Sequence, residues 1–163
     1  MTHKLTRCAL FAAMIALCAW IGIPMGHTVF TMQTFGVLLA LGLLGGKRGT
    51  VSILCYLLLG VVGLPVFSGF RGGIGPILGP TGGYLWGFLA TGLAYWALEK
   101  WNRPLGMIAG LVLCYGCGTI WYMHYAGGAL AAVLMQAVVP YLIPDGLKLV
   151  LALRLTRRLE RYV

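Results

Sequence analysis

The sequence predicts an all-α integral membrane protein with six transmembrane helices, cytoplasmic N- and C-termini, and a long glycine-rich outer loop between helices 3 and 4. First, 60% of its residues are hydrophobic and 9% are charged, whereas soluble domains carry roughly 25% charged residues. Second, the mean hydropathy is +0.92. Third, the cations gather at the ends of apolar runs. We expect residues 1–163 to form one domain, because about 20 residues per crossing leave room for roughly five to seven helices.

Six apolar segments are the predicted spans. They cover residues 8–24, 30–44, 51–64, 82–98, 104–122 and 144–159. The first is long enough to span and shows no cleavage site, so we expect it to be retained as a helix. Pro104 suits a helix start, where its missing donor is harmless. Residues 127–139 precede two prolines, and about 13 residues are too few for a crossing. We expect that stretch to be re-entrant or interfacial.

The positions of the cations orient these spans. With six crossings and both ends in the cytoplasm, ten of the twelve Lys and Arg residues lie inside: Lys4, Arg7, Lys47, Arg48, Lys100, Arg103, Arg154, Arg157, Arg158 and Arg161. Arg71 falls in an outer connection, and Lys148 lies near the outer end of the last span. A seventh crossing would place the basic tail outside, against the usual charge bias. Clustering at span ends also argues against a nucleic-acid surface, despite the net charge of +9.

A glycine-rich stretch, residues 63–88, connects the third and fourth spans. It reads GLPVFSGFRGGIGPILGPTGGYLWGF and holds eight glycines between positions 69 and 87. Glycine lets a ligand approach the backbone, while proline fixes φ and removes a donor. The segment is therefore no ordinary spanning helix, and its apolar side chains make it unlike a disordered linker. We interpret it as an ordered loop over a small-molecule site; the alternative is a connector that binds nothing.

Asp145 and Lys148 are the ionisable residues that the membrane boundary does not explain. The other two acids, Glu99 and Glu160, fall among basic clusters and are interpreted as surface charges. The spacing of Asp145 and Lys148 places them on one helix face, where such a pair contributes only about 0.2–0.5 kcal/mol. An ionisable group inside a span costs about 2.5–3.5 kcal/mol. A structural ion bridge is the alternative, but the balance favours a ligand that uses both groups.

The residues near this pair indicate what that ligand is. A carboxylate suits Lys148 or Arg71, and N–H donors suit Asp145, which only accepts. Aromatic side chains on or near the same outer side would wall an apolar pocket with a few polar groups: Phe67, Phe70, Tyr84, Trp86, Trp121, Tyr122 and Tyr125. The predicted ligand is a small, amphipathic anion with amide-like donors.

The cysteines and histidines do not form a recognisable catalytic or metal site. All five cysteines lie in apolar segments, and an odd number is no disulfide framework. Cys114 and Cys117 form a CxxC, which suits a redox or metal site, but two small apolar residues one turn apart explain it more simply. His27 and His124 are isolated, and no HExxH is present. Catalysis is therefore disfavoured.

The first span carries alanines at three- and four-residue spacing. They are Ala9, Ala12, Ala13, Ala16 and Ala19. Small residues at this spacing let another helix approach closely in lipid. Either an internal neighbour or a partner protein could occupy this face, and the spacing does not distinguish the two.

These motifs, taken together and in order, resemble the BioY family, the biotin-specific substrate-binding subunits (S components) of energy-coupling-factor (ECF) transporters. The glycine-rich signature at 65–88 is the most specific part. The alanine-rich first span, Gln33-Thr34, LLGGKRG at 43–49, CGTIW at 117–121 and PYLIPDGLKLVLA at 140–152 extend the resemblance along nearly the whole chain. The family often has Pro-Gly-Asp where this chain has Pro144-Asp145-Gly146, while the Asp-to-Lys spacing is kept.

The resemblance implies high-affinity capture of biotin at the outer side of a prokaryotic plasma (inner) membrane, followed by uptake. By that analogy Asp145 meets the ureido ring, and Lys148, with Arg71, meets the valerate carboxylate. The loop covers the ligand, so the implied binding residues also include Phe70, Gly72, Gly73, Thr81, Gly82, Gly83 and Tyr84. The implied docking surface for a transmembrane coupling (T) subunit comprises Ala9, Ala12, Ala13 and Ala16.

The resemblance also implies that two cytoplasmic ATPase subunits supply the energy and that this chain has no cofactor of its own. The sequence agrees with that division, because it contains no GxxxxGK[ST] to cradle ATP. Three alternatives stay open: an S component for another vitamin or a stand-alone biotin importer, an intramembrane enzyme, and a structural scaffold. The scaffold leaves Asp145 and Lys148 unexplained.

Overall fold

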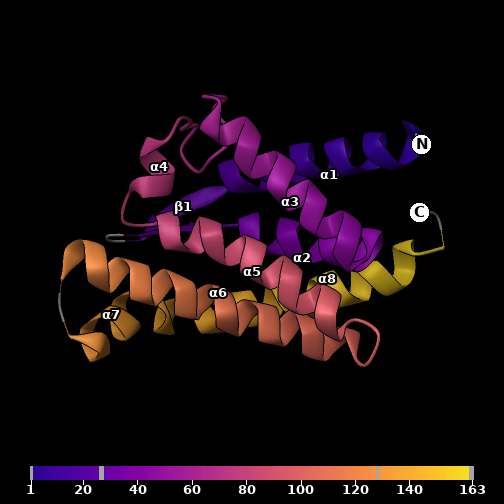
Figure 1. The fold of residues 1–163 in the computed structure, drawn as a ribbon. Helices are drawn as coiled ribbons and strands as arrows, with labels where there is room; N and C mark the ends of the chain where they lie inside the picture. The colour runs from indigo at the N-terminus through magenta and orange to yellow at the C-terminus, as the bar shows by residue number, and fades with distance from the viewer. Residues whose placement is uncertain (1, 26–27, 128, 162–163) are drawn as a thin grey trace.

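The computed structural model describes residues 2–25, 28–127 and 129–161 as a bundle of helices with one small hairpin (Figure 1). The elements, in order, are α1 (Thr2–Trp20), β1 (Gly22–Met25), β2 (Thr28–Thr31), α2 (Gln33–Leu44), α3 (Gly46–Val61), α4 (Gly75–Leu78), α5 (Gly82–Leu98), α6 (Arg103–Ala126), α7 (Leu130–Ala137) and α8 (Val139–Leu159). The prediction of a mostly helical chain is therefore confirmed.

Most predicted spans correspond to a helix, with shifted ends. Helix α5 coincides with the predicted fourth span, and α6 extends the fifth at both ends. Helix α8 begins at Val139, five residues before the expected start at Pro144. The reason is that Pro140 occupies the first turn, where a proline costs no hydrogen bond. Asp145 consequently lies well inside the helix instead of at its N-terminus.

The all-α prediction missed a two-stranded hairpin between α1 and α2. Strands β1 and β2 pair antiparallel, with Gly22 opposite Thr31. We expected helix to continue through residues 21–24 and to resume at Phe30. Instead, Pro24 opposes a helical continuation, and the β-branched and aromatic residues of β2 suit a strand. The hairpin matters because β2 reaches the functional site.

Helix length supports fewer crossings than the six predicted. Among the described helices, α6 alone is long and apolar enough to cross a membrane by itself. Helices α7 and α8, bent by 44° at their junction, would together make a second crossing. Helices α3 and α5 have 16 and 17 residues, or about 24–26 Å of helix against about 30 Å of hydrocarbon. The six-span topology stays a prediction.

Helix α2 is the centre of the bundle. It packs against α1, α3, α5 and α8, and nine of its twelve residues are buried. Because both neighbours in the chain and distant helices surround it, α2 is apolar all round instead of having a single apolar stripe. Gly45, with φ +79°, ends α2 and lets α3 start at once in a new direction.

Helices α5 and α6 pack through glycines. A Cβ added at Gly87 would lie 2.9 Å from the Cα of Cys114, and the Thr91 hydroxyl donates to the Gly110 carbonyl at 2.9 Å. Such small residues let two helix backbones approach closely. Cys114 is a buried free thiol against this glycine, which favours the packing interpretation of the CxxC.

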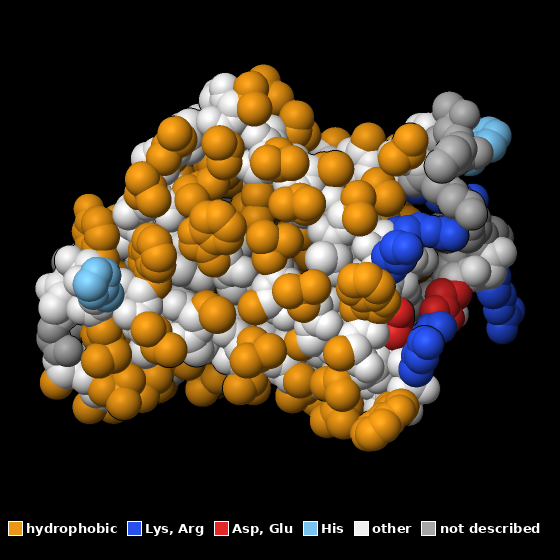
Figure 2. All heavy atoms as spheres, viewed as in Figure 1, with side chains coloured by type: hydrophobic (Ala, Val, Ile, Leu, Met, Phe, Trp, Pro, Cys, Tyr) orange, Lys and Arg blue, Asp and Glu red, His pale blue; other side chains and the backbone are white. Residues whose placement is uncertain are grey.

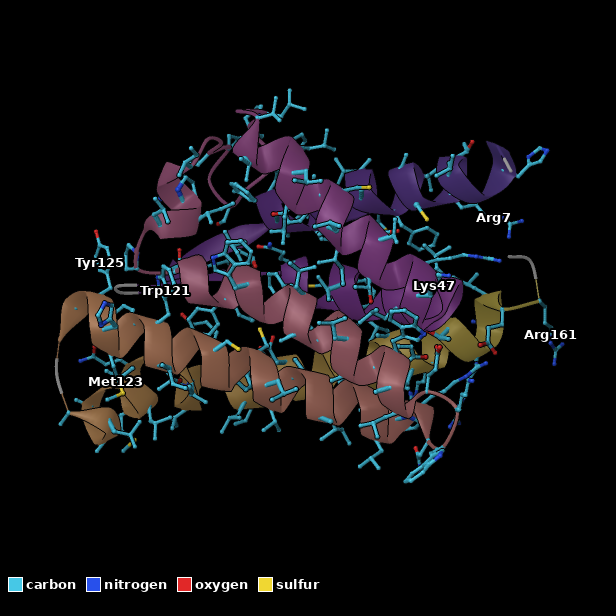
Figure 3. The ribbon with its side chains drawn as sticks, viewed as in Figure 1. Arg7, Lys47, Trp121, Met123, Tyr125 and Arg161 are labelled. Carbon is cyan, nitrogen blue, oxygen red and sulfur yellow. The ribbon has the colours of Figure 1, made fainter. Side chains whose placement is uncertain are left out.

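On the face shown in Figure 2, the Lys, Arg, Asp and Glu side chains gather at the end of the molecule where the chain begins and ends (Figures 1 and 2). At this end the Glu99 carboxylate accepts a hydrogen bond from the Gly46 amide at 2.6 Å, and Glu160 pairs with Arg103. Glu99 is therefore more than the surface charge we expected, because it satisfies a free amide at the start of α3. Figure 3 shows Trp121 and Tyr125 at the opposite end of the bundle from Arg7, Lys47 and Arg161.

The α5–α6 contact makes a prediction about stability. Gly87→Ala places a methyl group against backbone atoms of α6, so we expect a loss of about 1–3 kcal/mol of unfolding free energy. Gly116→Ala on α6 is the matched control, since an added Cβ there meets nothing within 4 Å. The control is expected to gain about 0.5–1 kcal/mol from helix propensity. Thermal unfolding in detergent measures both, and equal melting temperatures would contradict close packing at Gly87.

Candidate functional site

A cavity lies in the half of the bundle away from the charged end. It measures about 910 Å³ including the open space at its mouth. Its walls come from β2, α2, the α3–α5 loop, α5, α6, α7 and α8. The polar members of the wall are Thr31, Gln33, Thr34, Ser68, Arg71, Thr81, Tyr84, Tyr115, Tyr141, Asp145 and Lys148.

Asp145 and Lys148 form a buried ion pair in this wall. The Lys148 Nζ lies 2.7 Å from the Asp145 Oδ1, and both residues are 5% exposed. Removing either charge from water costs free energy. The attraction between the two charges offsets that cost only when their remaining donors and acceptors are also hydrogen-bonded. The predicted neighbours on one helix face are thus in direct contact inside the protein.

The hairpin supplies two further contacts to Lys148. Its Nζ donates to the Thr31 carbonyl at 2.6 Å and lies 3.9 Å from the centre of the Phe30 ring. An ammonium carries three donors, of which Asp145 and Thr31 take two. The third N–H has no hydrogen-bond acceptor among the described residues. The strand that sequence reasoning missed therefore positions the cation of the site.

Tyr115 of α6 holds the other oxygen of the carboxylate. Its hydroxyl lies 2.5 Å from the Asp145 Oδ2, which accepts the hydrogen bond. Each carboxylate oxygen accepts one protein donor, and each keeps a lone pair. The site therefore presents two acceptor positions beside one donor position at its buried end.

The glycine-rich loop forms one wall of the cavity. Phe67 is 2% exposed, and its ring meets the Tyr56 ring edge-to-face with centroids 5.6 Å apart. Gly60 of α3 makes room for that ring, because a Cβ there would overlap it. The Gly73 amide also donates to the Gly60 carbonyl at 2.7 Å. The loop is thus anchored to α3 by a side chain in a slot and by backbone.

Arg71 lies at the rim of the cavity and is exposed, whereas Asp145 and Lys148 are buried. Its Nε donates to the Ser68 carbonyl at 3.1 Å within the loop. The guanidinium keeps its other N–H groups for an anion. The arrangement separates a buried acid–base pair from a cation at the mouth, with apolar wall between them.

Five of the ten predicted binding residues line the cavity: Asp145, Lys148, Arg71, Thr81 and Tyr84. The other five do not: Phe70, Gly72, Gly73, Gly82 and Gly83. Two of these glycines serve close packing, since a Cβ at Gly82 would overlap the Ile77 carbonyl and one at Gly83 would overlap Trp121. Gly73 has φ +83°, which favours glycine irrespective of any ligand.

Phe70 faces away from the cavity. It is 63% exposed, has φ +57°, and stacks on Trp20 at the end of α1 with centroids 4.9 Å apart. The Trp20 indole N–H also donates to the Pro65 carbonyl at 2.8 Å. Phe70 and Pro65 therefore attach the loop to α1. An aromatic residue in this loop could equally have contacted a ligand, so residue type alone did not reveal this structural role.

Several cavity residues were not singled out by sequence reasoning. Tyr115 lies on a helix with no local motif, and Ser68 looked like part of a connecting loop. The Ser68 hydroxyl is buried and has no hydrogen-bond partner within the described chain. Gln33, noted only as part of a motif, donates to the Tyr56 hydroxyl at 2.9 Å. These residues come together at the cavity only when the chain is folded. Their spacing in the sequence therefore could not identify them as cavity residues.

The alanines of α1 fall into two groups. Ala12 and Ala16 are buried in the core with α2 and α3 neighbours, so in this structure they pack internally. Ala9 and Ala13 are exposed on the other side of the helix. A partner could reach only this second pair, and the docking prediction is kept for Ala9 and Ala13.

His27 lies outside the described residues. Among the residues that the structure does describe, no group of three or more His, Cys, Asp or Glu side chains is placed to hold a metal ion. The polar side chains that line the cavity can recognise a ligand by hydrogen bonds and charge.

The sequence matches one known protein family along its whole length. A sequence model of the BioY family matches residues 1–163. The chain belongs to the BioY family. A relative from Thermotoga maritima, named biotin transporter BioY, is 37% identical over 98% of this chain and 96% of its own length. A probable biotin transporter BioY from Pyrococcus horikoshii is 41% identical over 93% of each chain.

The BioY fold is also seen in a crystal structure. The S component for biotin from an ECF-type ABC transporter superposes with a TM-score of 0.90 at 30% identity, covering 99% of this chain and 93% of the other. The agreement extends to nearly the whole chain. Membership of the BioY family makes this chain a membrane protein of a transporter family.

The anchored loop of this BioY chain leads to a prediction about dynamics. Gly60→Ala removes the slot for the Phe67 ring, so we expect residues 64–74 to lose about tenfold in amide-exchange protection, or about 1.4 kcal/mol. Gly75→Ala, in the same loop but with no atom within 4 Å of the added Cβ, is the control. Hydrogen exchange with mass spectrometry measures both. Unchanged protection in Gly60→Ala would show that Phe67 does not anchor the loop.

Proposed function

We propose that this chain captures biotin at the outer side of the membrane and imports it as the S component of an ECF-type transporter. The observation that carries the proposal is the buried Asp145–Lys148 pair in the wall of the cavity. Family membership and the similarity to a biotin S component support it. The transported substrate is biotin, and the chain is a binding subunit instead of an enzyme.

The geometry favours one orientation of biotin. The ureido ring carries two N–H donors and one carbonyl acceptor, which complement the free acceptor positions on Asp145 and the free N–H of Lys148. Because Asp145 and Lys148 touch, both address the same end of the ligand. We therefore assign Lys148 to the ureido carbonyl instead of the valerate carboxylate. Arg71 at the rim is left to bind the carboxylate, and the unpartnered Ser68 hydroxyl is a further candidate contact.

The proposed topology has six crossings with both termini in the cytoplasm of a prokaryote and the cavity opening outward. The supporting observation is the charge distribution, since the basic end of the molecule is the end where the chain starts and finishes (Figures 1 and 2). Helices such as α3 and α5 then cross a locally thinned bilayer or rely on neighbouring helices.

Energy for uptake comes from partners in this proposal. A transmembrane coupling subunit docks on α1, and two cytoplasmic ATPases hydrolyse ATP. Ala9 and Ala13 are the exposed small residues on α1 and form the proposed contact. An S component for another vitamin and a stand-alone biotin importer are the alternatives. Competition of bound biotin by other vitamins tests the first, and uptake without the ATPases tests the second.

The binding site is tested by changing one charge at a time. Asp145→Asn and Lys148→Met each leave a buried group without its partner and remove a contact to the ureido ring. We expect biotin affinity to fall at least about 100-fold, or about 2.7 kcal/mol. Arg154→Gln, an exposed change on the same helix, is the control and should bind normally. Titration of labelled biotin into purified protein gives the affinities, and near-normal binding by both site variants would remove the assignment.

The docking surface is tested independently of biotin. Ala9→Leu and Ala13→Leu add bulk to the exposed face of α1, and we expect each to reduce co-purification of the coupling subunit severalfold because the helices can no longer approach closely. Ala97→Leu on the exposed face of α5 is the control for added bulk in lipid. Biotin affinity should be unchanged in all three. Full co-purification of both α1 variants would place the coupling subunit elsewhere.

A further inference from the structure

A second cavity lies at the basic end of the bundle, where α5, α6 and α8 meet. It measures about 510 Å³ including open space. Its polar lining consists of Tyr95, Arg103, Thr156 and Arg157, and its apolar lining includes Met107 and Leu153. None of these residues lines the biotin cavity. The proposed function therefore gives this second cavity no role.

One buried hydroxyl group in its wall has no hydrogen-bond partner among the described residues. Thr156 is 3% exposed, and its Oγ1 makes no hydrogen bond within the described chain. Tyr95, which is 1% exposed, also lines this cavity. Each unsatisfied buried polar group costs about 1–3 kcal/mol. The Thr156 hydroxyl lies against Gly42 of α2. A threonine in a helix can adopt more than one χ1 rotamer, so this hydroxyl can change its direction.

The charge at the cavity is positive. Arg103 and Arg157 both line it, and Arg103 is paired with Glu160 on its exposed side. Arg157 has no ion pair among the described residues and is exposed toward the solvent boundary. A guanidinium group presents a planar set of donors that matches the oxygens of a phosphate. Hydroxyl donors from Thr156 and Tyr95 would complete the coordination of such an anion.

The surroundings favour a lipid as the source of that phosphate. Outside the cavity, α6 and α8 expose apolar side chains, among them Leu105, Ile108, Val150 and Leu151. Basic pockets between helices on the cytoplasmic side are the sites where anionic headgroups bind. We propose that this cavity binds the phosphate group of an anionic membrane lipid, with the acyl chains along the apolar faces of α6 and α8. A free phosphate offers the same oxygens without the chains.

The experiment is thermal unfolding of the full chain in detergent with added phosphatidylglycerol, phosphatidylcholine or inorganic phosphate. We expect phosphatidylglycerol to raise the melting temperature in a saturable way and phosphatidylcholine to have no such effect. Arg157→Gln and Thr156→Val should each raise the half-saturating lipid concentration at least fivefold. Arg157 is chosen because its loss does not free a paired carboxylate. Arg158→Gln, an exposed arginine on α8 that does not line the cavity, is the matched control and should behave as wild type.

The outcomes separate the possibilities. Equal weakening by Arg157→Gln and Arg158→Gln would mean that diffuse surface charge attracts the lipid, and the absence of any phosphatidylglycerol effect on the wild type would also overturn the site. A further outcome is that inorganic phosphate alone raises the melting temperature of the wild type and that the two variants Arg157→Gln and Thr156→Val abolish that rise. This result would support a phosphate site but reject lipid as the source of the phosphate. Melting in phosphatidylcholine alone shows whether each variant is folded, and biotin affinity should stay unchanged in all of them.

Discussion

The buried pair of Asp145 and Lys148 is the constraint on which the functional half of this molecule depends. Two charges in an apolar bundle are tolerated only where neighbouring groups satisfy them. The structure meets that demand with three groups from two other elements: the Tyr115 hydroxyl of α6, and the Thr31 carbonyl and Phe30 ring of β2. What these groups leave unsatisfied, two acceptors and one donor, defines the shape of the ligand that the site can take.

Close packing through glycine makes that arrangement possible. The glycines of α5 and α6 bring two backbones together, and Gly60 admits the Phe67 ring that anchors the loop. These residues do not line the cavity. They set how closely α5 packs on α6, which carries Tyr115, and how the loop that carries Arg71 packs on α3. A glycine-rich composition thus serves the site mainly through packing geometry.

Sequence reasoning singled out three ionisable residues that line the cavity but only part of the rest of its wall. Asp145, Lys148 and Arg71 were identifiable because a charge in an apolar context is costly and therefore informative. Phe70 and several loop glycines were assigned to the ligand from residue type, yet Phe70 stacks on Trp20 and the glycines serve packing or turns. Ala12 and Ala16 were grouped with Ala9 and Ala13 because helical spacing identifies small residues without showing which face is covered.

The sequence by itself determined the membrane class, the helical character, the location of the basic end and the family. These follow from composition, from the clustering of charge and from motifs that are local in the chain. Only the tertiary structure decided that β2 supplies a carbonyl to Lys148, that Tyr115 holds Asp145, and that α8 starts before Pro144. The reason is physical: hydrogen bonds between residues 117 or 30 positions apart depend on how helices pack, and no local pattern encodes that packing.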